Sequence, residues 1–180
     1  MMENISRRNF MKGVGALAVA TAATGLLSGC GDDSLVVDAT GLNNAVEMKG
    51  VKMTVRSLAY AAYADGTYYF VPEVLVSNSG ATGVPLDPEN GSFEVWLNGK
   101  TKLNISKETM ARLDSSKDFN KMDTRNLSRN QQEKGCLCAK GTGVTTFNYV
   151  WVIFYPNPND RKTAMRCKIL YKEAKPMLGI

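Results

Sequence analysis

Two long runs rich in β-branched and aromatic residues, 51–63 and 67–78, flank the dipeptide Asp65-Gly66. Asp-Gly between two such runs is typical of a tight β-hairpin. The two runs are long enough for the hairpin to form the backbone of a sheet, so the sequence predicts a half-buried antiparallel pair here.

A two-residue loop fixes the register of this hairpin, and it places small or apolar residues opposite each other on one face. The pairs expected on that face are Ala61 with Phe70, Ala59 with Pro72, Ser57 with Val74, and Val55 with Val76. Because proline lacks a backbone donor, Pro72 is expected to face an edge or a bulge. Four tyrosines gather near the hairpin tip, with Tyr63 opposite Tyr68. These tyrosines are Tyr60, Tyr63, Tyr68 and Tyr69. They either stabilise the hairpin by cross-strand packing or contact a partner.

Three further runs predict strands. Residues 93–97 alternate and meet Asn98-Gly99, where a three-residue loop gives the better register. That loop pairs Leu97 with Thr101, Val95 with Leu103, and Phe93 with Ile105. Residues 145–155 carry apolar side chains on both faces, which indicates a central strand. Residues 164–172 form the last strand, with Met165, Cys167, Ile169 and Tyr171 facing inward.

The segment 106–134 interrupts this pattern. Ser106 is placed to cap a short helix from Lys107 to about Leu113. The following residues are polar, with only Phe119, Met122 and Leu127 to bury. Such a long insertion is either mobile or functional.

Strands at this spacing, joined by turn-rich loops, predict an all-β fold: an immunoglobulin-like antiparallel β-sandwich with a short helix and a long polar insertion around 106–134. We expect four regions along the chain. They are an export signal over 1–29, a tether over 30–44, the β-sandwich over 45–174, and a C-terminal tail over 175–180.

The first 29 residues have the three parts of an export signal: a basic head, an apolar middle and a small-residue end. Residues 6–12 read SRRNFMK, which resembles the bacterial twin-arginine signal S-R-R-x-F-L-K, with Arg7, Arg8 and Phe10 at its defining positions. The resemblance implies export of an already folded protein across the cytoplasmic membrane.

Residues 27–30 read LSGC and resemble a lipobox, the L-[AS]-[GA]-C site of bacterial lipoproteins. The resemblance implies that Cys30 receives a diacylglycerol and becomes the mature N-terminus. The two acyl chains would hold the protein stably on the outer, extracytoplasmic face of the membrane.

Composition narrows the function. The formal net charge is +5, and residues 1–29 carry three basic side chains and one acidic one, which leaves +3 for the remaining 151 residues. This balance does not indicate nucleic-acid binding. There is no histidine, so the usual general base and the commonest zinc ligand are both absent from the chain. No cofactor motif, catalytic motif or metal-ligand pattern is present, and we expect a protein that is not an enzyme.

Three cysteines remain beyond Cys30: Cys136, Cys138 and Cys167. In an oxidising compartment a bridge from Cys167 to Cys136 or Cys138 is expected, with one thiol left over. Two alternatives stay open. The thiols remain reduced and buried, or they serve thiol redox or metal-handling chemistry.

The region 45–172 resembles the DUF4352-type immunoglobulin-like lipoprotein domain. The stretches that carry the resemblance are YYFVPEVLVSNSG, FEVWLNGK and VWVIFYP. The resemblance implies a sandwich fold and a role in binding at the cell surface. We therefore expect a membrane-anchored, non-enzymatic binding or accessory module with a protein or glycan partner. The alternative is a thiol redox or metal-handling envelope protein.

Overall fold

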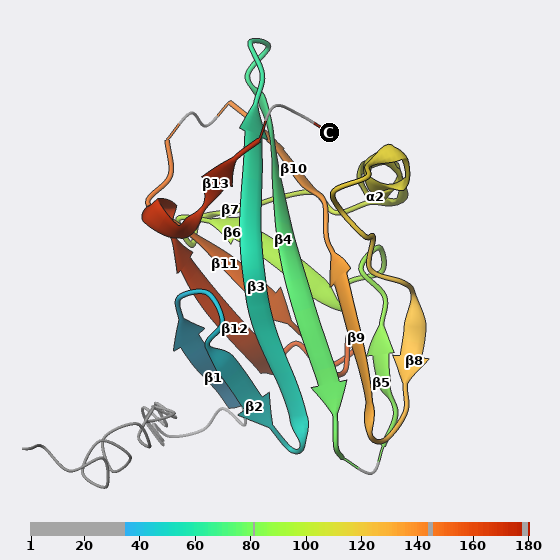
Figure 1. Ribbon diagram of the computed structural model, residues 1–180. Helices are drawn as coiled ribbons and strands as arrows, with labels where there is room; N and C mark the ends of the chain where they lie inside the picture. Colours follow the sequence, from blue (N-terminus) through green and yellow to red (C-terminus); the bar gives the residue numbers. More distant parts are fainter. Residues whose placement is uncertain (1–34, 81, 144–145, 178–179) are drawn as a thin grey trace, which may run out of the picture.

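The computed structural model describes residues 35–80, 82–143, 146–177 and 180. Two β-sheets pack face to face, and one short helix lies beside the second sheet (Figure 1). The predicted all-β sandwich is confirmed.

The first sheet has five strands in the order β1-β12-β11-β6-β7. Their bounds are β1 (Leu35–Thr40), β12 (Thr163–Leu170), β11 (Tyr149–Phe154), β6 (Phe93–Leu97) and β7 (Thr101–Lys102). The run 145–155 was predicted to be a central strand, and β11 indeed lies in the middle of this sheet. The three-residue turn after β6 is also as predicted, with Leu97 opposite Thr101 and the Leu103 amide donating to the Val95 carbonyl over 2.8 Å.

The second sheet is built on the long hairpin of β3 (Val51–Ala62) and β4 (Thr67–Asn78). Shorter strands pair with one or the other of them: β2 (Ala45–Met48), β9 (Gln131–Cys136), β10 (Ala139–Thr142) and β13 (Lys175–Pro176). Two strands, β5 (Val84–Leu86) and β8 (Arg125–Leu127), form a small separate pair.

The predicted register of the long hairpin was wrong by one residue at the tip, because the loop has three residues and not two. The Tyr63 amide donates to the Thr67 carbonyl over 2.8 Å. Gly66 adopts φ +78°, which glycine adopts without steric cost. Ala61 therefore pairs with Tyr69, and Tyr63 does not face Tyr68. A bulge between Val55 and Ser57 shifts the lower half by a further residue.

Pro72 lies inside the second sheet, on β4, and marks an interruption. It accepts a hydrogen bond from the Leu137 amide over 3.0 Å but has no N–H to return. The register of β9 and β10 on β4 is continuous, with Cys136 opposite Glu73 and Ala139 opposite Phe70. One edge strand is thus broken into β9 and β10 opposite the proline.

The predicted tether and tail were both wrong in part. β1 pairs in parallel with β12, because Val37 and Ala39 pack against the core while Asp38 binds Arg166 on the other face. The sandwich therefore includes Leu35–Thr40, which the prediction had assigned to the tether. At the other end β13 pairs in parallel with β3, so this part of the expected tail belongs to the second sheet.

The predicted helix cap is confirmed. Ser106 caps α2 (Lys107–Ala111), accepting from the Thr109 amide over 3.3 Å, and Thr109 Oγ1 accepts from the Ser106 amide over 2.9 Å. A 3-10 helix, η1 (Arg112–Ser115), follows, and a second one, η2 (Tyr171–Glu173), ends the last long strand. Tyr171 is 52% exposed, so the expectation that it faces inward was wrong.

The helical start of the insertion 106–134 covers part of the outer face of the second sheet. Met110 and Leu113 join Tyr69 and Val71 of β4 in a small cluster that is separate from the main core between the sheets. Met122 and Leu127 are buried in the main core. The approach is close: a Cβ at Gly135 would lie 2.3 Å from the Met122 Cα, so only glycine fits there.

Candidate functional site

The outer face of the first sheet carries most of the large half-buried aromatic side chains of that sheet. Side chains of β11 alternate between the two faces. Those that face the core are fully buried: Val150, Val152 and Phe154. Those that face outward are half-buried: Tyr149, Trp151 and Ile153. The alternation that makes β11 a good core strand therefore also brings aromatic rings to the surface.

One row of side chains crosses all five strands on this outer face. Adjacent strands pair so that the row reads Thr40, Lys168, Trp151, Trp96 and Lys102. Trp96 and Trp151 lie directly opposite each other and are the two tryptophans of the chain. Each is half-buried, so both rings keep some contact with solvent.

Cations lie over the rings. The Lys168 Nζ is 4.2 Å from the Tyr149 ring centroid, and the Arg166 Cζ is 5.0 Å from that of Trp151. At the other end of the face, the Arg161 Cζ lies 4.3 Å from the Tyr155 centroid. These are cation–π distances. On this surface, positively charged groups therefore lie directly above aromatic rings.

We call this surface the aromatic face. It consists of Tyr149, Trp151, Trp96 and Tyr155 with the basic residues Lys102, Arg161, Arg166 and Lys168 and the acidic residues Asp38 and Glu94.

Glu94 is the most buried charged residue of the aromatic face, at 8% exposed. Its carboxylate accepts hydrogen bonds from Lys102 Nζ over 2.7 Å, Trp96 Nε1 over 2.8 Å and the Tyr155 hydroxyl over 3.1 Å. Burial by itself raises the pKa of this carboxyl, but the hydrogen bonds and the charge of Lys102 outweigh it, so the pKa lies below its ordinary value. Glu94 is thus a fixed anion that orients its neighbours.

Asp38 and Arg166 form the second ion pair of the aromatic face. Arg166 Nε and Nη2 donate to the two carboxylate oxygens of Asp38, each over 2.7 Å. These hydrogen bonds raise the pKa of Arg166. A two-point contact of this kind fixes the geometry of the guanidinium, so the pair joins β1 firmly to β12.

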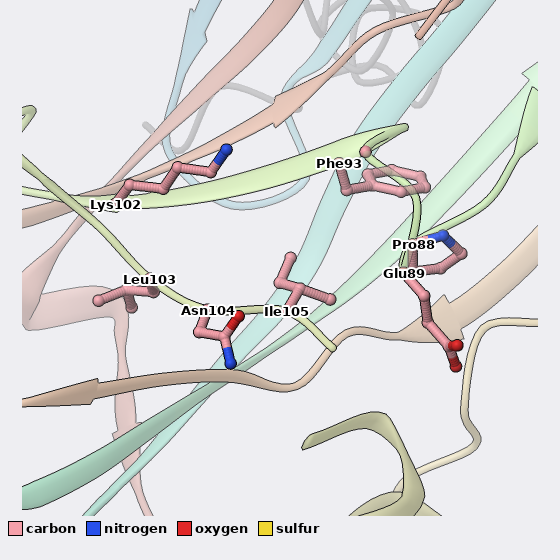
Figure 2. Close-up of a pocket in the computed structure, with 8 residues that line it drawn as sticks. Pro88, Glu89, Phe93, Lys102, Leu103, Asn104 and Ile105 are labelled. Atoms are coloured by element: carbon pink, nitrogen blue, oxygen red, sulfur yellow. The ribbon is translucent and has the colours of Figure 1, made fainter. Parts of the chain in front are cut away.

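A shallow pocket of about 350 Å³ adjoins the aromatic face where the chain leaves β7. Lys102 belongs to both the pocket and the aromatic face. Figure 2 shows Lys102 and Glu89 at opposite sides of the view, with Ile105 between them. The remaining lining residues are Pro88, Gly91, Phe93, Leu103 and Asn104. The pocket has a mixed lining, with one side chain of each charge.

The expected disulfide is not formed. All three cysteines of the described residues are free and buried. Cys167 faces the main core, whereas Cys136 and Cys138 lie in the small cluster under α2, on the far side of the second sheet. The hairpin backbone separates the two sets, which is why the expected bridge from Cys167 to Cys136 or Cys138 was wrong.

Burial also makes these thiols unreactive. It raises the pKa of Cys136 to about 11, with the charge of Glu73 as a second cause. It raises the pKa of Cys138 and that of Cys167 to about 12. A thiol with such a pKa forms almost no thiolate at neutral pH. Among the described residues, no group of three or more His, Cys, Asp or Glu side chains is placed to hold a metal ion.

The tyrosines of the hairpin tip serve mostly in packing. Tyr68 and Tyr69 are buried, in the main core and in the small cluster respectively. Tyr63 packs edge-on against Tyr69, with ring centroids 5.8 Å apart, and is 38% exposed. Tyr60 stacks on Phe70. The remaining predicted site residues, Arg7, Arg8, Phe10 and Cys30, lie outside the described residues.

The sequence pattern did not identify the aromatic face. The alternation of residues 145–155 predicted aromatic side chains on one face of a strand. It did not show which strands lie on either side, or that Trp96, Lys102 and Lys168 are in the same row. The pairing that joins the two halves of the row, Trp96 opposite Trp151, links residues more than fifty positions apart, and no local signal specifies it.

Comparison with known proteins supports the export signal and the fold. Residues 4–25 match the family described as the TAT (twin-arginine translocation) pathway signal sequence. The chain is therefore one that is directed to export across the cytoplasmic membrane, as its paired arginines predict. Within the described residues, no helix is long and apolar enough to cross a membrane.

Two solved structures from Bacillus subtilis are similar in fold. One is a candidate lipoprotein, ycdA, of strain 168. It has 12% identity and a TM-score of 0.52, and the match covers 71% of this chain and 38% of that protein. The other is the yjhA protein, with 10% identity and a TM-score of 0.50 over 73% of this chain and 99% of that one. At these identities the likeness concerns the fold alone. A search of curated protein sequences gives no match.

Proposed function

We propose that this protein is a membrane-anchored extracytoplasmic lipoprotein that acts as a non-enzymatic binding or accessory module, with the aromatic face as its contact surface. The observation that carries the proposal is the row of Lys168, Trp151, Trp96 and Lys102 across the first sheet. Tryptophan and arginine are enriched where proteins meet a partner, and Trp96, Trp151 and Arg166 all lie on the aromatic face.

The anchor is part of the proposal. It rests on the LSGC sequence that ends in Cys30 and on the fold that this chain shares with a candidate lipoprotein. The resemblance of residues 45–172 to the DUF4352-type domain belongs to the same proposal. In this view Cys30 carries two acyl chains and the β-sandwich stands outside the cytoplasmic membrane.

A non-enzymatic role fits the chemistry of the aromatic face. Its two carboxylates are each held by cations, Glu94 by Lys102 and Arg161, and Asp38 by Arg166. Glu94 is not poised to exchange a proton near neutral pH, because its pKa lies below its ordinary value and a general base works best with a pKa near the operating pH. The chain supplies no histidine for this purpose.

The alternative is a thiol redox or metal-handling protein. It needs accessible thiolates, whereas Cys136, Cys138 and Cys167 are buried with raised pKa values and lie on two sides of a sheet. No specific feature of the described residues favours this alternative over a binding module.

Membrane fractionation tests the anchor. The native protein should stay with membranes after a high-salt wash and be released by detergent, whereas Cys30→Ser should be released by the wash. Ser28→Ala is the matched control, because alanine is allowed at that lipobox position, and it should remain anchored. Release of the native protein by salt alone would refute the anchor.

Crosslinking in intact cells tests the contact surface. A photo-crosslinking residue at Lys168 should give adducts. The same residue at Lys134, on the outer face of the second sheet, should give few. Equal yields at the two positions, or none at Lys168, would contradict a contact role for the aromatic face.

A further inference from the structure

We infer that the aromatic face docks flat on the anionic lipid headgroups of the membrane that holds the anchor. This inference rests on the proposed function and names what covers its contact surface. Three independent features of the described residues point to a lipid surface: the place where the chain enters the domain, the charge of the aromatic face, and its aromatic and aliphatic content.

The first feature is the distance from the anchor. Cys30 is followed by only four residues before β1 begins at Leu35. The five Cα–Cα steps from Cys30 to Leu35 span at most about 18 Å. β1 is the edge strand of the first sheet, and its residues Asp38 and Thr40 belong to the rows of the aromatic face. A lipid at Cys30 therefore keeps the edge of the first sheet close to the bilayer.

The second feature is charge. The aromatic face contains four basic side chains and two acidic ones, a formal charge of +2. Lys168 makes no salt bridge among the described residues and projects over Tyr149 and Trp151. Basic groups near a bilayer are attracted by anionic lipids. On the outer face of the second sheet, by comparison, Lys52 and Lys134 are each paired with a glutamate.

The third feature is the presence of amphipathic aromatic side chains and exposed aliphatic side chains. Tryptophan and tyrosine are enriched at the headgroup level of membranes, where one end of the ring system is apolar and the other is wet. Leu35 and Val36, at the start of β1, are 36% and 43% exposed. They are two of the four large hydrophobic residues that are exposed in the described part of the chain. In the sequence, Leu35 and Val36 follow Cys30 by five and six positions.

Tryptophan fluorescence gives a direct test, because Trp96 and Trp151 are the two tryptophans of the chain and both lie on the aromatic face. The acylated protein is reconstituted in vesicles that contain brominated phosphatidylcholine, with or without phosphatidylglycerol. We expect strong quenching with phosphatidylglycerol and weaker quenching without it. Quenching should also fall at about 1 M salt, where charges are screened beyond about 3 Å.

Charge variants in the unacylated Cys30→Ser background test the face without the anchor. Flotation with phosphatidylglycerol-containing vesicles should show roughly thirtyfold weaker binding for Arg166→Gln/Lys168→Gln, because each basic residue near the surface contributes about fivefold. The matched control is Lys52→Gln/Lys134→Gln, which removes the same charge from the second sheet and should change binding less than about threefold. The signal segment is the same in every variant, so it cancels in the ratio.

The double variant could lose binding simply because it unfolds. A variant that is expected to bind more tightly therefore provides a second test. Asp38→Asn removes one negative charge from the aromatic face, so its formal charge becomes more positive, and the variant should bind the same vesicles more tightly. The inference is overturned if the tryptophans are not quenched in phosphatidylglycerol vesicles, or if the control variant loses as much binding as the double variant. It is also overturned if heparin or an acidic peptide changes the tryptophan fluorescence while vesicles do not.

These experiments distinguish failure of the anchor hypothesis from failure of the docking hypothesis. If Cys30 carries no lipid, fractionation shows it, and flotation of the unacylated chain still reports on the face. If the face does not dock, the acylated protein remains on the vesicles but its tryptophans stay unquenched.

Discussion

The Tyr155 hydroxyl donates a hydrogen bond to Glu94 Oε2 over 3.1 Å, which ties the end of β11 to the neighbouring strand β6. Burial is the largest cause of the raised pKa of Tyr155, and the negative charge of Glu94 adds to it. Trp96 and Lys102 complete the set of donors around the same carboxylate. One buried anion thus organises the part of the aromatic face that borders the pocket.

Replacing Glu94 by glutamine should destabilise the fold. The variant keeps the shape of the side chain but loses the charge-assisted hydrogen bond with Lys102, and it leaves buried donors imperfectly paired. We expect a loss of about 1–3 kcal/mol in the free energy of unfolding, measured with urea. Glu89→Gln, at an exposed pocket position, is the control and should change stability by no more than about 0.5 kcal/mol.

The contribution of Glu94 should depend on pH in a defined direction. Its pKa is lower in the folded protein than its ordinary value of 4.5. The stabilisation is therefore fully present above pH 4.5 and is lost as the pH falls through the folded-state pKa. Urea unfolding at neutral pH and at about pH 3 should show the difference between the native protein and Glu94→Gln narrowing in acid. A difference that is constant or grows on acidification would contradict this account.

The three described cysteines should resist thiol reagents in the folded protein. Their burial and raised pKa values, about 11 for Cys136 and about 12 for Cys138 and Cys167, leave almost no thiolate. Ellman's reagent should react with them only after unfolding, when all three titrate. Rapid reaction of the folded protein, or a bridge seen on non-reducing electrophoresis, would favour the redox alternative.

The cap of α2 should control access to one of these thiols. Ser106→Ala removes the side-chain acceptor of the Thr109 amide, which should cost about 1 kcal/mol in unfolding free energy. Met110 of α2 packs against Cys138, whose amide donates to the Met110 Sδ over 3.3 Å. Loosening α2 should therefore speed the labelling of Cys138 more than that of Cys167. Ser128→Ala, at an exposed position outside α2, should leave both rates unchanged.

The paired arginines of the signal should be required for export. Arg7→Lys/Arg8→Lys keeps the charge of the basic head but removes the pair that the twin-arginine pathway reads. Precursor should accumulate in the cytoplasm, as measured by fractionation and blotting. A matched change at Lys12 to arginine should leave export intact. Normal export of the double variant would assign the chain to another pathway.

Local signals in the sequence predicted local structure well. Ser106 and Thr109 have the spacing of a capping box, and α2 begins there. The turn at Asn98-Gly99 was predicted with its observed pairing of Leu97 and Thr101. Each of these features depends on residues a few positions apart, so turn and cap chemistry are enough to specify it.

Features that depend on distant residues could not be predicted in this way. The predicted register of the long hairpin was wrong by one residue at the tip, because Asp65-Gly66 fits both a two-residue loop and the observed three-residue loop. β1 resembled a polar tether because its stabilising partner, β12, lies about 128 residues away. A disulfide was predicted because a sequence does not show which face of a sheet each thiol occupies.

The parallel pairing of β1 with β12 has a consequence for the order of events during biosynthesis. Leu35, near the start of the chain, lies opposite Thr163, and Thr40 lies opposite Lys168. The first sheet can therefore be completed only after residues 163–168 have been synthesised. The translocase that the N-terminal signal addresses receives a substrate in which β1 is held by the distant strand β12.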